Sequence, residues 1–188
     1  MGKSKKYGMN TKALHANKKF EPITGDIMPP LHLSTTYKND IPGESEYFYG
    51  RVNNPTRELF ERTLGSLEGI ENYDEMHALA MASGMSAVSL IAELVKPGEN
   101  VVITKDVYGG TTNYFSKIIT ERGVEVNFCD FSDYEMLKSL LNEKTKLAWI
   151  ESPSNPSINL YDLSKTAEIV HENGTFLVAD STFSTPFI

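Results

Sequence analysis

Two groups of residues have the types and spacing to bind an anion such as a phosphate. In ASGMSAV (82–88), Gly84 would let the backbone approach a ligand, and the first amides of a following helix lack intrahelical partners. The alternative is an ordinary helix start with Ser83 as N-cap. Arg51 offers a forked donor to phosphate, and the Tyr49 hydroxyl would add a third donor. The alternative here is a surface arginine packed on an aromatic neighbour.

Three further side chains could contact a flat, polar ring. Tyr108 lies beside two glycines in DVYGGT and could stack on a ligand, although a glycine-rich turn with a half-buried tyrosine fits equally well. Asn155 in ESPSNP could direct its amide at a ligand, or it could serve only the turn. Asp180 ends the apolar run FLVA, where a carboxylate needs a partner such as a protonated ring nitrogen.

The elements that must position these residues alternate regularly along the chain. The sequence predicts helices at 56–70, 84–96, 111–122, 133–142 and 163–173, and strands at 101–104, 124–130, 146–152 and 175–180. Right-handed crossovers between parallel strands explain this order and predict an α/β fold with a mostly parallel sheet. Ligands of such sheets bind at the carboxyl ends of the strands. The positions to inspect are Asp106–Gly110, Asp130, Glu151–Pro156 and Asp180–Thr182.

Residues 1–55 differ from the remainder. They are rich in proline and glycine, show little periodicity, and predict an extended arm that packs on another surface, whereas 56–188 form the regular domain. Within the first 20 residues there are six lysines and no acid, which we interpret as a solvated segment: Lys3, Lys5, Lys6, Lys12, Lys18 and Lys19.

The composition argues against several kinds of partner and ligand. A net charge of −7 argues against nucleic acid and anionic membrane partners, and no apolar run is long enough to span a bilayer. The single cysteine, Cys129, fits packing in a reducing, cytoplasmic setting. The histidines lack metal-ligand spacing, so no metal site is expected: His15, His32, His77 and His171.

Together, these groups describe a phosphate, a stacked ring and a ring nitrogen that stays protonated, which is the chemistry of pyridoxal phosphate. A dinucleotide or another phosphate ligand is the weaker alternative, because neither a G-x-G-x-x-G motif after the first strand nor a Walker-type loop is present.

The segments YGRVNNPT, ASGMSAV, DVYGGT, ESPSNP and VADSTFSTP, in this order, resemble the Cys/Met-metabolism family of pyridoxal-phosphate enzymes. The resemblance implies the fold type I large domain of the aspartate aminotransferase superfamily. It implies that Gly84 and Met85 hold the cofactor phosphate through their amides. It further implies that Tyr108 stacks on the ring and assists proton transfer, that Asn155 lies near the 3-hydroxyl, and that Asp180, supported by Thr182, pairs with the ring nitrogen.

The same resemblance implies how subunits associate. Tyr49 and Arg51 match the pair that reaches the phosphate of a neighbouring subunit, in a homotetramer built from two dimers. The implied activity is carbon–sulfur bond cleavage in a sulfur amino acid, most like cystathionine γ-lyase. Methionine γ-lyase, cystathionine γ-synthase, cystathionine β-lyase and O-acetylhomoserine sulfhydrylase remain alternatives, and Gly110 departs from the cysteine that is usual in methionine γ-lyases.

The chain also departs from the family. The Ser-x-Thr-Lys segment of the Schiff-base lysine is absent, and Lys165 in LSKTAEIV lies in a different context. We therefore expect this sequence to be the N-terminal part of a longer enzyme and to be inactive by itself. The alternative of another class is a non-catalytic fragment that acts only in assembly.

Overall fold

The computed structural model describes residues 7–15, 23–41, 43–69 and 78–187 and divides into two compact units. The first is Met1–Ala80 with Phe187, and the second is Met81–Pro186. The predicted domain boundary between residues 55 and 56 concerns the complete protein and stays a prediction. Several residues singled out in the sequence lie outside the described ranges: Lys3, Lys5, Lys6, Lys18, Lys19, Ile70 and His77.

In its described residues, the first unit contains two helices, α1 (Met9–His15) and α2 (Pro55–Leu67). The sequence did not predict α1, because its seven residues are too few for a periodic pattern to emerge. α2 begins as its sequence dictates, since Pro55 occupies the first turn and the Asn54 side chain accepts hydrogen bonds from the amides of Thr56 (2.9 Å) and Arg57 (3.3 Å).

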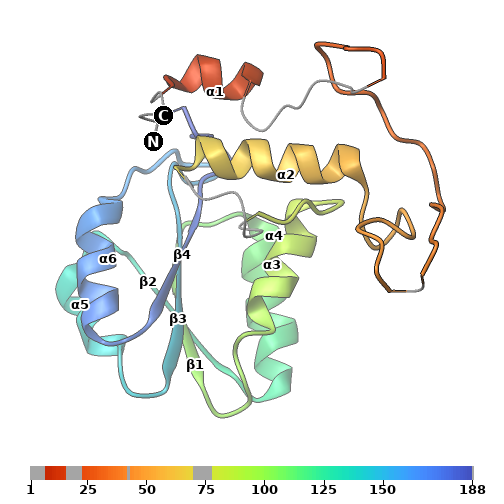
Figure 1. The fold of residues 1–188 in the computed structure, drawn as a ribbon. Helices are drawn as coiled ribbons and strands as arrows, with labels where there is room; N and C mark the ends of the chain where they lie inside the picture. The colour runs from red at the N-terminus through yellow and green to blue at the C-terminus, as the bar shows by residue number, and fades with distance from the viewer. Residues whose placement is uncertain (1–6, 16–22, 42, 70–77, 188) are drawn as a thin grey trace. The chain divides into compact units, whose positions relative to one another are not determined.

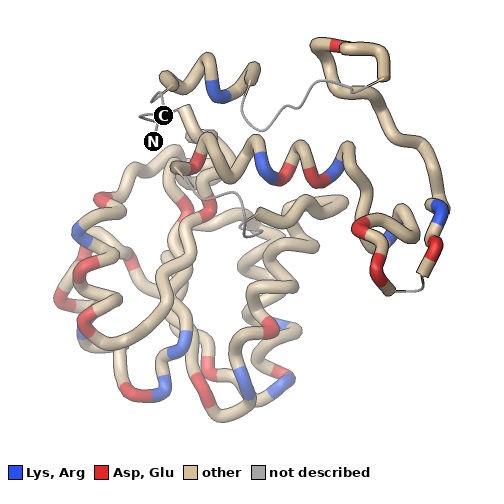
Figure 2. The backbone as a smooth tube through the Cα atoms, viewed as in Figure 1, with Lys and Arg blue, Asp and Glu red and all other residues tan. Residues whose placement is uncertain are grey.

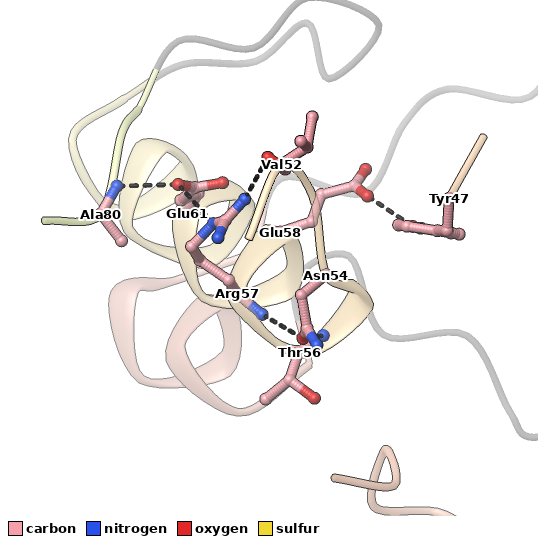
Figure 3. A network of polar contacts seen from close by, with 8 residues as sticks. All are labelled: Tyr47, Val52, Asn54, Thr56, Arg57, Glu58, Glu61 and Ala80. Carbon is pink, nitrogen blue, oxygen red and sulfur yellow. Dashed lines mark hydrogen bonds and ion pairs between the residues drawn. The ribbon is translucent and has the colours of Figure 1, made fainter. Parts of the chain in front are cut away.

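Polar side chains of α2 tie the neighbouring segments to it (Figure 3). The Glu61 carboxylate, only 4% exposed, accepts a 2.8 Å hydrogen bond from the Ala80 amide. Arg57 donates to the Val52 carbonyl at 2.6 Å. The Tyr47 hydroxyl donates to Glu58 at 2.5 Å, and burial together with this hydrogen bond raises the pKa of Tyr47. The segment just before α2 is therefore held by several independent bonds.

The second unit is built on a parallel four-stranded sheet. Its strands are β1 (Asn100–Thr104), β2 (Glu125–Cys129), β3 (Thr145–Glu151) and β4 (Phe176–Asp180), in the order β2-β1-β3-β4. The prediction of an α/β fold with a parallel sheet is confirmed. β1 and β3 are buried almost throughout, as central parallel strands are.

Helices cover both faces of this sheet (Figure 1). One face packs on α3 (Gly84–Ala92), α4 (Gly109–Asn113) and the π-helix η1 (Tyr114–Ile119), around Phe115, Ile103 and Trp149. The other packs on α5 (Tyr134–Leu140) and α6 (Leu163–Glu172), around Phe131, Val102 and Ile150. The alternation of residues along each strand decides which core a side chain enters.

Three details depart from the predicted elements. The helix expected at 111–122 begins at Gly109 and passes through η1 into the 3₁₀ helix η2 (Thr120–Arg122), ending at Gly123 with φ of 83°. α3 ends at Ala92, earlier than predicted. β4 was expected to be buried, but it is the edge strand of the described sheet and leaves Phe176 57% exposed. In the described ranges, no helix has the length and apolar character needed to cross a membrane.

Candidate functional site

A pocket of about 320 Å³ lies in the second unit, at the carboxyl ends of the strands. Six of the residues predicted as site residues line it: Gly84, Met85, Tyr108, Asn155, Asp180 and Thr182. They come from α3, from the last residue of β4, and from the segments that follow β1, β3 and β4. Parallel strands end at one edge of the sheet, which is why residues nearly 100 positions apart meet there.

The start of α3 contributes free donors to the pocket. Ser83 caps the helix by accepting from the Ser86 amide at 3.2 Å. Among the described residues, none accepts a hydrogen bond from the amide of Gly84 or Met85. A Cβ at Gly84 would meet nothing within 4 Å, so open space lies in front of this backbone. The helix start can therefore be both capped and able to receive an anion.

Tyr108 immediately precedes α4, and its side chain is 49% exposed. Its ring lies so close to Gly110 that a Cβ there would approach Tyr108 Cε1 to 2.4 Å and Met85 Sδ to 2.9 Å. Glycine at this position thus makes room for the ring. A half-exposed ring that lines a pocket can stack on a flat ligand without prior rearrangement.

Two carboxylates stand side by side at the end of the sheet. Glu151 and Asp180 are register partners of β3 and β4, so their side chains point to the same face. Asp180 Oδ1 accepts hydrogen bonds from the Thr182 hydroxyl (2.6 Å) and amide (3.1 Å), which orient the carboxylate. The described residues that line the pocket include no lysine, arginine or histidine. The pair favours a ligand that carries a positive charge here.

Glu151 was within the predicted range of ligand positions, but no role was assigned to it. It is 4% exposed and accepts hydrogen bonds from the amides of Tyr108 (2.8 Å) and Asn155 (2.7 Å). Burial raises the pKa of Glu151, these two bonds oppose the rise, and the nearby Asp180 adds to it. The argument that singled out Asp180, a carboxylate that ends an apolar strand, applies equally to Glu151 and could have found it.

Thr111 is a second pocket residue that the sequence did not suggest. It is fully buried, and its hydroxyl has no hydrogen-bond partner among the described residues. A threonine within a short helix carries no signal of this kind in sequence, since only its depth in the fold makes the hydroxyl unusual. A polar ligand group would satisfy it.

Asn155 lies in a loop that is hydrogen-bonded to the Asp106 carboxylate. Asp106 accepts from the Ser154 hydroxyl at 2.5 Å, the Asn159 amide group at 2.6 Å and the Ser157 hydroxyl at 3.2 Å. The turn chemistry considered for this segment is thus present, and it presents Asn155 to the pocket. The turn interpretation is confirmed, and a ligand-binding role of the Asn155 amide stays a prediction.

Asp130, another inspected position, serves a different purpose. It accepts from Ser132 and pairs with Lys105 Nζ at 3.0 Å, and these bonds lower the pKa of Asp130 to about 2. It does not line the pocket. Its carboxylate already has partners and stabilises the turn after β2.

Tyr49 and Arg51 belong to the first unit. The Arg51 guanidinium lies over the Tyr49 ring, 5.0 Å from its centroid. Gly50 between them approaches the opposite segment closely, donating to the Thr35 carbonyl at 2.7 Å, and a Cβ there would lie 2.9 Å from Ser34 O. Among the described residues, none forms a hydrogen bond or ion pair with Arg51. The pair is ordered, and its charge is available to an anion.

Charged residues stand at both ends of the strands of the second unit (Figure 2). Each strand has an acid at or just after its carboxyl end: Asp106, Asp130, Glu151 and Asp180. At the amino ends, basic residues are mixed with acids: Lys96, Arg122, Lys144 and Lys146 with Glu99, Glu121, Glu125 and Glu143. The pocket edge therefore combines helix-start amides that suit an anion with carboxylates that suit a cation, which fits a ligand carrying both charges.

Comparison with known proteins agrees with this geometry. The family described as "Cys/Met metabolism PLP-dependent enzyme" matches residues 10–188. The cystathionine beta-lyase of Coxiella burnetii is 41% identical over 187 residues, 98% of this chain and 47% of the relative. The cystathionine gamma-lyase of Dictyostelium discoideum is 37% identical over 183 residues, 96% of this chain and 46% of the relative. The chain spans about half the length of these curated relatives.

Solved structures agree as well. The metB protein of Corynebacterium glutamicum superposes with a TM-score of 0.88 at 34% identity, covering 96% of this chain and 46% of that one. CalE6 from Micromonospora echinospora gives 0.86 at 35% identity, covering 96% and 47%. Both similarities extend over the two units described above.

Proposed function

The chain belongs to the family of Cys/Met metabolism PLP-dependent enzymes, and from this premise we propose that the complete protein is a carbon–sulfur lyase of sulfur amino acids, most like cystathionine γ-lyase. The observation that carries the proposal is that one pocket is lined by six of the predicted residues, with two adjacent carboxylates and helix-start amides that have no partner among the described residues. Pyridoxal phosphate matches this pocket, because it combines a phosphate with a protonated pyridine nitrogen.

The phosphate, the ring face, the 3-hydroxyl and the ring nitrogen of the cofactor each have a candidate partner in this chain. The amides of Gly84 and Met85 would bind the phosphate, and the Thr111 hydroxyl is a further polar contact in the pocket. Tyr108 would stack on the ring, with Asn155 beside the 3-hydroxyl. Asp180, oriented by Thr182, would keep the ring nitrogen protonated. When bound, the cofactor supplies an electron sink for the bonds broken at the substrate's carbon atoms.

The chain's own residues would then bind, orient and move protons. Asp180 holds a proton at the ring nitrogen, since a neighbouring negative charge favours the protonated form. The Tyr108 hydroxyl, half exposed at the pocket, can accept and return a proton from the substrate side. The Val88 and Phe183 side chains add apolar surface that limits the access of water.

The arm contributes to subunit assembly in this proposal. Arg51 and Tyr49 would reach the phosphate of a neighbouring subunit within a homotetramer. The Arg51 guanidinium lies over the Tyr49 ring and has no counter-ion among the described residues, which supports this role because the forked donors of arginine suit phosphate. The single cysteine of the chain supports a cytoplasmic location.

The test is Asp180→Asn in the complete protein, with Glu143→Gln as an exposed control. Asparagine keeps an oxygen acceptor for Thr182 but removes the charge, so we expect the affinity for pyridoxal phosphate to fall by roughly 10- to 150-fold, the range of a charge-assisted hydrogen bond. Turnover should fall further. Wild-type protein that does not bind the cofactor, or a variant with normal turnover, would contradict the proposal.

The choice between β- and γ-chemistry is a second question. Relatives named cystathionine beta-lyase, cystathionine gamma-lyase and probable cystathionine gamma-synthase are 41%, 37% and 33% identical to this chain. The region that the chain spans is therefore similar in proteins with all three names. Cystathionine cleaved at Cγ, with uptake of water, gives cysteine, 2-oxobutyrate and ammonia, whereas cleavage at Cβ gives homocysteine, pyruvate and ammonia. Product analysis after incubation with cystathionine separates them. Formation of only homocysteine and pyruvate would replace the γ-lyase proposal.

A further inference from the structure

The Glu151 carboxylate links two loops that line the pocket. Its Oε2 accepts the amide of Tyr108 at 2.8 Å, and its Oε1 accepts the amide of Asn155 at 2.7 Å. The first amide belongs to the segment after β1, and the second belongs to the loop after β3. Because Glu151 is only 4% exposed, water competes little for either of these hydrogen bonds.

The two bonds bear directly on the ligand-binding side chains. Tyr108 is the residue before α4, so its amide position sets the backbone from which the ring projects. Asn155 is placed in the same way. Asp106 holds the same loop as well, but through the side chains of Ser154, Ser157 and Asn159, and none of these three bonds reaches Tyr108 or Asn155. Glu151 alone among the described residues bonds to the backbone of both.

The chemistry of the position requires a carboxylate. A glutamine side chain has one acceptor and one donor group, so one of the two amides would face an N–H group. A buried carboxylate beside Asp180 is costly, because burial and a neighbouring negative charge both disfavour its charged form. The carboxylate offsets this cost because its two oxygens accept hydrogen bonds from both amides.

We propose that Glu151 is a positioning residue, which fixes the Tyr108 ring and the Asn155 amide relative to each other across the pocket. The inference rests on the proposed function, since the bound molecule between these two side chains is taken to be pyridoxal phosphate. Glu151 itself acts through the backbone amides of its two partners.

The test is a double-mutant cycle in the complete protein, freed of bound cofactor. Glu151→Gln, Tyr108→Ala and their combination are titrated with pyridoxine 5′-phosphate, which lacks the aldehyde and cannot bond to a lysine. The melting temperature of each variant is measured without ligand. Glu168→Gln on the exposed face of α6 makes the same chemical change away from the pocket and serves as control.

We expect Glu151→Gln to weaken binding of the probe by roughly 5- to 30-fold in the wild-type background. In the Tyr108→Ala background the same change should weaken binding by less than about threefold, because the ring is gone and only the effect through Asn155 remains. Glu168→Gln should change neither quantity. If Glu151→Gln does not fold, Glu151→Asp keeps the charge, shortens the reach, and should show the same coupling.

Equal weakening in both backgrounds would assign Glu151 a purely structural role and overturn the inference while leaving the proposed function in place. Unchanged binding in Glu151→Gln would overturn it as well. Wild-type protein that does not bind the probe would refute the proposed function, and this inference with it.

Discussion

Gly110 controls the position of the Tyr108 ring, and replacing it tests how the pocket works. A Cβ at residue 110 would lie 2.4 Å from Tyr108 Cε1, and ordinary contact begins at 3.4 Å, so the ring edge must retreat by about 1 Å. The change is Gly110→Ala. The neighbouring Gly109 offers a matched control, because a Cβ there meets nothing within 4 Å and both residues lie in the first turn of α4.

The expected cost falls on binding and not on folding. Tyr108 is 49% exposed, so its ring can turn away for about 0.5–1.5 kcal/mol, and an alanine in a helix returns about 0.5–1 kcal/mol relative to glycine. The stacking contact is worth about 0.5–1.5 kcal/mol, so its loss should weaken cofactor binding by roughly 2- to 13-fold. A displacement of this size at a group that transfers protons can lower turnover by up to about 100-fold.

The assay compares Gly110→Ala, Gly109→Ala and wild type in the complete protein. Melting temperature, affinity for pyridoxal phosphate and turnover of cystathionine are measured for each. Gly109→Ala should match wild type in the last two. If the two alanine variants behave alike, or if Gly110→Ala binds and turns over normally, the reasoning that links the glycine to the ring is wrong.

Three further predictions concern other residues. Gly84→Ala should leave the melting temperature nearly unchanged, because a Cβ at this position meets nothing within 4 Å. The variant should bind pyridoxine 5′-phosphate roughly tenfold more weakly and phosphate-free pyridoxine almost as well as wild type. Equal effects on both ligands would contradict the phosphate site. The pKa of Asp130 is lowered to about 2, so its contribution to stability is present above its ordinary value of 3.8 and is lost as the pH falls through 2. Asp130→Asn should therefore lower the free energy of unfolding by up to about 1 kcal/mol at pH 7, and the difference should vanish below about pH 2 in denaturant titrations. A difference independent of pH would count against the hydrogen bonds from Ser132 and the Lys105 ion pair as its source. Burial raises the pKa of Cys129 to about 11, so alkylation at pH 8, followed by peptide mass mapping, should be slow in the folded protein and fast in urea, and fast labelling without urea would contradict the buried thiol.

Sequence reasoning succeeded where a local pattern had one structural meaning. The alternation of β-branched runs with helical segments predicted the parallel sheet, and Gly123 marked the end of a helix, as its φ of 83° requires. Sequence reasoning failed where the burial of a segment depends on which elements lie beside it in the fold. The run FLVA before Asp180 has the composition of a buried strand, but β4 is the edge strand of the described sheet, so its residues are half exposed.

The site divides in the same way. The sequence by itself determined the chemical groups: donors at a helix start around Gly84, an aromatic ring at Tyr108 and a carboxylate at Asp180. Their order along the chain also identified the family. Only the tertiary structure decided that Glu151 joins Tyr108 to Asn155 and pairs in register with Asp180, since these contacts depend on which strands are neighbours and where each one ends. A hydrogen bond between residues 43 positions apart is a property of the fold, and no local pattern in the chain records it.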